Sequence, residues 1–184
     1  MKAKMKKIIL LVAAIFTFGF ANAQYKDFGL KGGLNRADLS NSGTSALVGF
    51  HIGGFAEFMV MEKFDLQPEL LLSTQGAKYD SADLNLIYIN LPVMGKYQVT
   101  DFFSIEAGPQ IGFLVSAKED DVDVIDSYNT IDFCVNLGVG YNLNEKMMLQ
   151  LRYNLGLSEI EKSLPSSIDG SKNAVIQLSF GYKL

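Results

Sequence analysis

The chain ends in Ile176-Gln177-Leu178-Ser179-Phe180-Gly181-Tyr182-Lys183-Leu184, in which an apolar residue stands at every second position. Alternation with a period of two predicts a β-strand that has one apolar and one polar face. Strands in soluble proteins have about 5–6 residues, whereas a tilted strand that crosses a bilayer has about 9–11. The same pattern recurs upstream, and the longer predicted strands indicate a barrel in a membrane. The sequence predicts strands at 26–37, 46–60, 63–75, 86–98, 102–115, 131–142, 147–157 and 173–184.

The connections between these strands are long and short in turn. Long outer loops, short periplasmic turns and an even strand number are typical of bacterial outer-membrane barrels, and they leave both termini in the periplasm. We therefore expect an all-β fold, an eight-stranded antiparallel up-and-down transmembrane β-barrel in the outer membrane of a Gram-negative (diderm) bacterium. The long polar connections are 38–45, 76–85, 116–130 and 158–172, and the short ones are 61–62, 99–101 and 143–146.

The first 23 residues have the composition of a secretion signal. Four lysines precede an apolar run at 8–20, and Ala21-Asn22-Ala23 fits a cleavage site with small residues. We expect a signal peptide at 1–23 and one barrel domain at 24–184. Without the four lysines, 12 basic residues stand against 20 acidic ones, which argues against a nucleic-acid partner. The single cysteine excludes an intramolecular disulfide framework.

The two faces of each strand differ in character. One phase is apolar, whereas the other combines glycine with single charges, a mixture that suits a crowded interior better than a face in water. An arginine on the lipid side would cost about 2–4 kcal/mol at the bilayer midplane. We therefore place the apolar phase in lipid and expect a polar cluster inside. Its charged members are Lys31, Glu57, Glu69, Lys96, Glu106 and Arg152.

This interior cluster has two interpretations. It can be a packed, salt-bridged plug, or it can line a path for ions. The interior of an eight-stranded barrel has just enough room for side chains, which favours the plug.

Some residues break the alternation. Phe55, Leu71, Met94 and Leu114 fall on the polar phase, and Pro68, Pro92 and Pro109 interrupt strands. Because each proline removes a ladder donor, we expect β-bulges at these positions.

Aromatic residues recur on the apolar phase at the expected periplasmic ends of the strands. Barrels in outer membranes carry aromatic girdles at the two interfaces. We expect such a girdle, made of Phe28, Phe58, Phe64, Tyr97, Phe103, Tyr141 and Tyr182.

Several segments resemble the PorT-like outer-membrane β-barrel family of the Bacteroidetes. They are residues 28–35 (FGLKGGLN), 66–76 (LQPELLLSTQG), 89–97 (INLPVMGKY), 105–112 (IEAGPQIG), 151–157 (LRYNLGL) and 180–184 (FGYKL). The resemblance implies an eight-stranded barrel of the OmpA/OmpX type, whose C-terminal strand is read by the barrel-assembly machinery. The final residue here is Leu184, where such barrels usually end on Phe. The founding member of the family serves protein export, but a shared barrel does not transfer that role.

Two groups of residues raise the question of chemistry. His51 lies on the inward phase near the outer rim, where Asp132 and Ser73 could join it in a rim enzyme, although a hydrogen-bonded structural histidine is the simpler interpretation. The acidic connection carries Asp120, Asp121, Asp123 and Asp126, which are weak candidates for Ca²⁺ or for ion bridges to lipopolysaccharide phosphates. No phosphate loop or dinucleotide motif indicates a cofactor, and Cys134 is expected to be a small buried residue.

The first functional hypothesis is a non-enzymatic outer-membrane barrel with a plugged interior. It would act through its outer loops or as an accessory to envelope transport or secretion, with membrane lipid, lipopolysaccharide and secretion components as partners. The alternatives are a small porin-like pore, the rim enzyme with His51 and a soluble periplasmic barrel.

Overall fold

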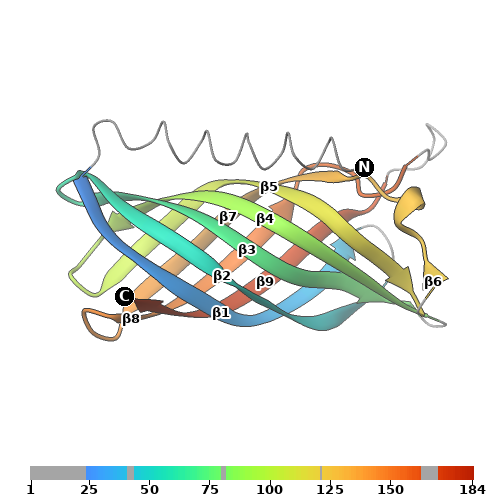
Figure 1. Cartoon of the computed structure of the whole chain (residues 1–184), viewed down its shortest axis with the longest axis horizontal. Coiled ribbons are helices and arrows are strands. Elements are labelled where there is room, and N and C mark those ends of the chain that lie inside the picture. Colours follow the sequence, from blue (N-terminus) through green and yellow to red (C-terminus); the bar gives the residue numbers. More distant parts are fainter. Residues whose placement is uncertain (1–23, 41–43, 80–81, 121, 163–169) are drawn as a thin grey trace.

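The chain forms a closed, tilted β-barrel (Figure 1). The computed structural model describes residues 24–40, 44–79, 82–120, 122–162 and 170–184, so the predicted signal peptide lies outside the described residues. Within the described part, no helix is long and apolar enough to cross a membrane. The barrel strands are β1 (Gln24–Ser40), β2 (Ser45–Met61), β3 (Phe64–Lys78), β4 (Asp83–Gln98), β5 (Phe103–Glu119), β7 (Ile131–Asn142), β8 (Met147–Gly156) and β9 (Lys172–Lys183). The short β6 (Val122–Asp123) and the 3₁₀ turn η1 (Ile125–Ser127) lie between β5 and β7.

Every neighbouring pair of barrel strands is antiparallel, and the first strand closes on the last. The β1–β9 register runs from Gly29↔Lys183 to Ser40↔Lys172. Closure matters in lipid because no water is present there to satisfy the backbone groups of a free strand edge. The predicted fold class, an eight-stranded antiparallel barrel, is confirmed.

The two ends of the barrel differ. The short turns, the start of β1 and the C-terminus lie at one end, which we call the turn end, and the longer connections lie at the other, the loop end (Figure 1). At the turn end, the backbone N–H of Leu184 donates to the carbonyl of Phe28 at 3.0 Å.

Strands β1 to β5 extend further toward the loop end than the sequence predicts. Pairing continues through segments expected to be loops, because Lys78 pairs with both Ser45 and Asp83, and Glu119 pairs with Leu84. In these extensions the inward face is apolar, with Ala77, Leu84 and Ala117 fully buried, whereas outward residues such as Lys78 and Lys118 are polar and exposed.

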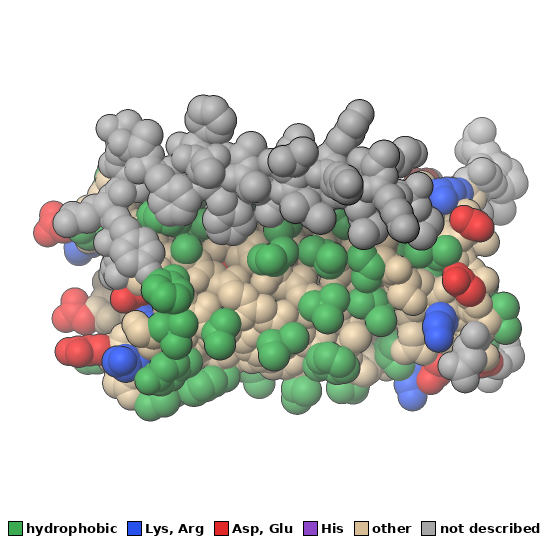
Figure 2. Space-filling view, in the orientation of Figure 1, with side chains coloured by type: hydrophobic (Ala, Val, Ile, Leu, Met, Phe, Trp, Pro, Cys, Tyr) green, Lys and Arg blue, Asp and Glu red, His purple; other side chains and the backbone are tan. Residues whose placement is uncertain are grey.

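The predicted phase assignment agrees with the burial of the side chains. Apolar residues such as Leu30, Ile52 and Leu178 are 51–61% exposed on the outer wall. Figure 2 shows apolar side chains over the middle of the visible face and charged ones at its two ends. The interior instead holds polar residues and the four apolar exceptions, Phe55, Leu71, Met94 and Leu114, none more than 5% exposed.

The prediction of bulges at Pro68, Pro92 and Pro109 is wrong. The β3–β4 register runs unchanged past Pro68, as does β4–β5 past Pro92 and β5–β7 past Pro109. A proline removes one donor, but its φ is compatible with an extended strand, so the register need not slip. The shifts occur elsewhere, between Tyr25/Asp27, Ala46/His51, Met59/Met61 and Ile87/Tyr88.

Glycine permits close approach of neighbouring strands at two inward positions. A Cβ on Gly33 would lie 1.9 Å from the carbonyl oxygen of Leu178, and one on Gly53 would lie 2.0 Å from that of Leu70. Both distances are shorter than any non-bonded contact, so no side chain fits there without moving the backbone.

Candidate functional site

The barrel interior is the most elaborate polar site among the described residues. The six charged residues expected to point inward come from β1, β2, β3, β4, β5 and β8, and all lie in the lumen with side chains at most 2% exposed. The barrel closure brings them together, because their separations in sequence are too large for local structure to do so. We call Lys31, Glu57, Glu69, Lys96, Glu106 and Arg152 the charge cluster.

Arg152 is the centre of the charge cluster. Its Nη1 and Nη2 donate to the two carboxylate oxygens of Glu69 at 3.0 and 2.8 Å. Its Nε donates to Oε2 of Glu106 at 3.0 Å. A planar guanidinium that forks onto a carboxylate gives charge-assisted bonds with a fixed geometry. One side chain from β8 therefore joins β3 and β5 across the lumen.

The two lysines extend the cluster. Lys31 Nζ donates to Glu69 at 3.0 Å and to Gln150 at 2.9 Å. Lys96 Nζ lies 3.3 Å from Glu57 and 4.0 Å from Glu106. Removing one partner from a buried set of ion pairs typically lowers the free energy of unfolding by about 3–5 kcal/mol, because it leaves an uncompensated charge in the interior.

Lys183 and Asp27 continue the network to the turn end, and sequence reasoning missed both. Lys183 Nζ lies 3.0 Å from Asp27 and 3.6 Å from Glu57. Both residues share the inward phase of their strands, so the alternation itself was the signal that could have found them.

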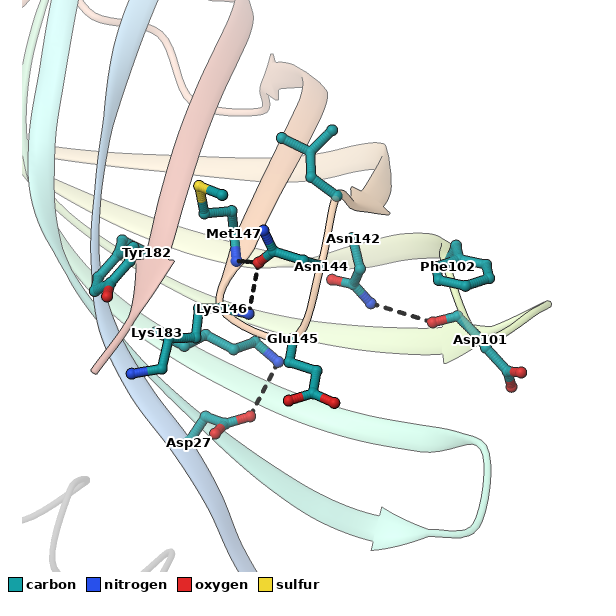
Figure 3. A pocket seen from close by; sticks show the side chains of 11 residues that line it. Asp27, Asp101, Phe102, Asn142, Asn144, Glu145, Lys146, Met147, Tyr182 and Lys183 are labelled. Atoms are coloured by element: carbon teal, nitrogen blue, oxygen red, sulfur yellow. Dashed lines mark hydrogen bonds and ion pairs between the residues drawn. The ribbon is translucent and has the colours of Figure 1, made fainter.

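The turn end opens as a concavity of about 1120 Å³ (Figure 3). The turn between β7 and β8 forms one wall, in which Asn144 Oδ1 accepts the backbone N–H groups of Lys146 and Met147. The Lys183–Asp27 ion pair lies beside it in Figure 3. Because Lys183 also contacts Glu57, this concavity borders the charge cluster.

Apolar side chains pack together inside the barrel toward the loop end. Ile160, in the connection between β8 and β9, is 1% exposed and packs against residues of four strands. Asn129 donates its backbone N–H to the carbonyl of Ile160 at 2.7 Å, which ties the β5–β7 connection to the β8–β9 connection. We call this cluster the apolar plug: Leu39, Ala77, Leu84, Leu86, Tyr88, Leu114, Ala117 and Ile160.

Two tyrosines outside the membrane-spanning part report on the packing of these connections. Partial burial, with the neighbouring Tyr79, Glu119 and Glu161, raises the pKa of Tyr128 to about 12. Burial and the same two carboxylates raise the pKa of Tyr79. Both phenols therefore stay neutral at physiological pH.

The structure does not assemble the rim site predicted from His51, Asp132 and Ser73. His51 Nδ1 lies 2.9 Å from Asn35 Oδ1, and its Nε2 lies 2.8 Å from Ser179 Oγ. Ser73 bonds to Asn35, and Asp132 bonds to other groups. The Ser179–His51–Asn35 order resembles a catalytic relay, but all three side chains are at most 2% exposed, which leaves a substrate no approach.

The described aspartates of the acidic connection differ in their surroundings. Asp120 Oδ1 accepts the backbone N–H of Asp83 at 3.1 Å, and Asp123 Oδ1 accepts that of Ile125 at 3.0 Å. Asp126 is exposed, and Asp121 lies outside the described residues. Among the residues with a described position, no three or more His, Cys, Asp or Glu side chains are grouped to hold a metal.

The predicted girdle residues fall into three groups. Phe28, Tyr97, Tyr141 and Tyr182 are 42–52% exposed on the outer wall, and Phe64 and Phe103 are half-buried. Phe58 is 4% exposed, but it pairs with Leu66, whose neighbours Asp65 and Gln67 are the buried inward residues, so it stays on the outward phase of β2.

Comparison with known proteins gives one sequence family and a set of similar folds. The family described as outer membrane protein β-barrel domain matches residues 20–162. Neisserial surface protein A superposes with a TM-score of 0.62 at 15% identity, covering 87% of this chain and 99% of its own. The attachment invasion locus protein Ail of Yersinia pestis superposes with a TM-score of 0.52 at 10% identity, covering 86% and 98%. Another structure of Ail, in complex with the heparin analogue sucrose octasulfate, superposes with a TM-score of 0.52 at 14% identity. It covers 88% of this chain and 99% of its own. At these identities the likeness concerns the fold alone, and no curated protein sequence matches the chain.

Proposed function

The chain belongs to the outer membrane protein β-barrel domain family, and from this premise we propose that it is a non-conducting, non-enzymatic barrel that acts through its outer loops. Residence in the outer membrane follows from the family and from the fold. The closed interior and the use of the loops are the parts that go beyond family membership.

The observation that carries the proposal is the Arg152 bridge. Its guanidinium binds Glu69 on β3 and Glu106 on β5, so protein atoms occupy the lumen at this depth. A conducting pore needs water-lined space for the passing ions. Here the basic side chains Lys31, Lys96 and Arg152 are each already paired with a carboxylate. The apolar plug is a second barrier at the loop end. The charge cluster and the apolar plug lie one after the other along the lumen, and together they support a non-conducting barrel rather than a pore.

The orientation follows the convention of these barrels. Short turns face the periplasm and long connections face outward, so the turn end with the C-terminus is periplasmic in this proposal. The β1 and β9 strands then present Leu184 to the barrel-assembly machinery from the inner side.

The outer connections supply the surface that can meet a partner. Glu119, Asp120, Asp123 and Asp126 make the β5–β7 connection acidic. Ail has been solved with a heparin analogue, a polyanion. The acidic character here favours cationic partners, or divalent ions that bridge to lipopolysaccharide phosphates, over sulfated sugars.

A planar-bilayer recording of the purified protein tests the closed interior. We expect no steady conductance steps in symmetric potassium chloride, with a porin inserted in the same way as the control for reconstitution. Steady open channels with a fixed unitary conductance would refute the plugged interior and establish the alternative, a small pore.

A role as an accessory to secretion is the second candidate, because segments 66–76 and 89–97 resemble the PorT-like family. This role is tested by comparing the secreted proteome of a deletion strain with that of its parent. The envelope of both strains must be shown to be intact. Periplasmic accumulation of exported proteins supports the role, and unchanged export removes it. Unchanged lipid A and protease profiles after His51→Ala would support the absence of enzymatic activity.

A further inference from the structure

Arg36 is a cationic residue on the outer wall of the barrel. It belongs to β1, where it follows Leu30 and Leu34 on the outward phase, and it is exposed. Its cross-strand partners are Val48 on β2, which is 72% exposed, and Ile176 on β9, which is 41% exposed. Arg36 therefore stands among apolar, outward-facing side chains rather than in a connection.

The guanidinium of Arg36 is not neutralised by the protein. Among the described residues, no ion pair and no hydrogen bond engages it. Asp38, the next outward residue of β1, instead accepts Thr44 Oγ1 and the backbone N–H of Leu39 through its Oδ1, both at 2.9 Å. The cost of an arginine on the lipid side falls toward the interfaces, where its long side chain can reach the headgroups. At that level membrane lipids carry phosphate, the natural partner of a guanidinium.

An apolar groove of about 340 Å³ lies on the outer wall beside this arginine. Gly138 and Arg152 pair with one another, and the side chain of Arg152 points into the lumen, so the floor of the groove there is backbone. Outward side chains of β7, β8 and β9 form its sides: Leu137, Val139, Leu151, Tyr153 and Ile176.

Strand pairing connects the groove to Arg36. Leu137 pairs with Tyr153, Tyr153 pairs with Ile176, and Ile176 pairs with Arg36. Directly opposed residues of antiparallel strands have Cα atoms only about 4.5–5.5 Å apart, so the arginine lies one strand beyond the last residue that lines the groove. Val139 lies nearer the turn end of β7, whereas Arg36 lies near the loop end of β1. The groove and the cation thus form one elongated surface, charged at the side nearer the loop end.

We propose that this surface binds one molecule of lipid A, the phosphorylated anchor of lipopolysaccharide, with an acyl chain in the groove and a phosphate on Arg36. The planar fork of arginine binds phosphate through two parallel hydrogen bonds. The phenol of Tyr153, 43% exposed between the groove and Arg36, supplies a donor for the oxygens that join acyl chains to the headgroup. The choice of lipid rests on the proposed orientation, in which the loop end faces outward and Arg36 lies in the outer leaflet.

Native mass spectrometry of the folded barrel in detergent, titrated with lipid A, tests the phosphate contact. Diphosphoryl lipid A should bind one-to-one and about tenfold more tightly than dephosphorylated lipid A. Arg36→Gln should remove this preference, and Arg36→Lys, which keeps the charge but not the fork, should keep part of it. Lys118→Gln is the matched control and should retain the preference, because Lys118 is exposed on β5, on the opposite wall from β1.

Equal affinity for the two forms of lipid A, or a preference that Arg36→Gln leaves unchanged, would overturn the proposal. Equally tight binding of phosphatidylglycerol would also overturn it, because the surface would then select any anionic headgroup. Inorganic phosphate alone should not displace lipid A, since it leaves the groove unfilled.

A second pair of variants tests the groove. Val139→Phe adds bulk to its lining and should weaken the binding of both forms of lipid A severalfold. Val135→Phe, on the same face of β7 but outside the lining, should leave the binding unchanged. Both substitutions keep an apolar side chain on the outer wall, and heat-modifiable gel mobility checks that the variants fold. Equal affinity of the two folded variants would overturn the placement of an acyl chain in the groove.

The binding assay uses purified protein, so its outcome is independent of conductance and of the orientation in the cell. Labelling of Lys118 in intact cells by a membrane-impermeant amine reagent tests the orientation separately, because this residue lies near the loop end of β5. Labelling supports contact with the outer leaflet. Protection in intact cells, followed by labelling once the envelope is opened, would overturn the assignment to lipid A.

Discussion

Arg152 and Glu69 are 83 residues apart in the sequence, yet they form a two-pronged ion pair across the lumen at 3.0 and 2.8 Å. The pair joins β8 to β3, strands that do not neighbour one another in the sheet. It therefore depends on closure of the barrel, and it also fills the space that closure creates.

Glu69→Gln should lower the free energy of unfolding by about 3–5 kcal/mol. The amide keeps the shape of the side chain but leaves Arg152 and Lys31 without the carboxylate that both now bind. Urea titration of the protein folded in lipid vesicles measures the change. Glu145→Gln, at an exposed turn residue, is the matched control and should change stability little. Equal stability of the two variants would show that the ion pair is dispensable.

Gly53→Ala should destabilise the barrel by about 1–3 kcal/mol or block its folding. The new methyl group would meet the carbonyl oxygen of Leu70 at 2.0 Å. Gly54→Ala provides a neighbour for comparison, because the nearest atom to its Cβ is the Gly29 carbonyl oxygen at 3.5 Å. Heat-modifiable gel mobility separates folded from unfolded barrel, and a fully folded Gly53→Ala fraction as large as that of Gly54→Ala would contradict the packing argument.

Ile160→Ala should loosen the connections at the loop end at a cost of about 2–5 kcal/mol in local stability, the range for truncating a buried aliphatic side chain. The side chain is 1% exposed and packs in the apolar plug. Hydrogen exchange at the backbone amide of Asn129, which bonds to the carbonyl of residue 160, measures the opening. Val122→Ala, at a position 65% exposed, should leave this exchange unchanged.

Alkaline titration should reveal one phenol with a pKa near 12, and Tyr128→Phe should remove it. Burial is the largest cause of the raised pKa of Tyr128, ahead of Tyr79, Glu119 and Glu161. The folded-state pKa lies above the ordinary value of 10.0, so the contribution of this group to stability is full below pH 10. It is lost as the pH rises from about 10 to about 12, where the unfolded chain ionises first. Ultraviolet absorbance of phenolate measures the titration, and an unshifted curve identical to that of Tyr128→Phe would contradict it.

The sequence by itself determined the eight strands, their antiparallel order and which face of each turns inward. These follow from a period of two, which is a local property of a pleated strand in contact with lipid on one side. For the same reason the six charged residues of the cluster could be placed in the interior one strand at a time.

Only the tertiary structure decided which inward residues meet. The register between strands and the closure of β1 on β9 set the depth of each side chain, and neither is encoded locally. Hence Arg152 binds Glu69 and Glu106, and His51 meets Ser179 rather than Ser73. Ile160 joins the apolar plug from a connection that carries no strand pattern. The alternation predicts which face of the sheet a residue lies on. Its contacts, however, depend on where the other seven strands place their inward side chains.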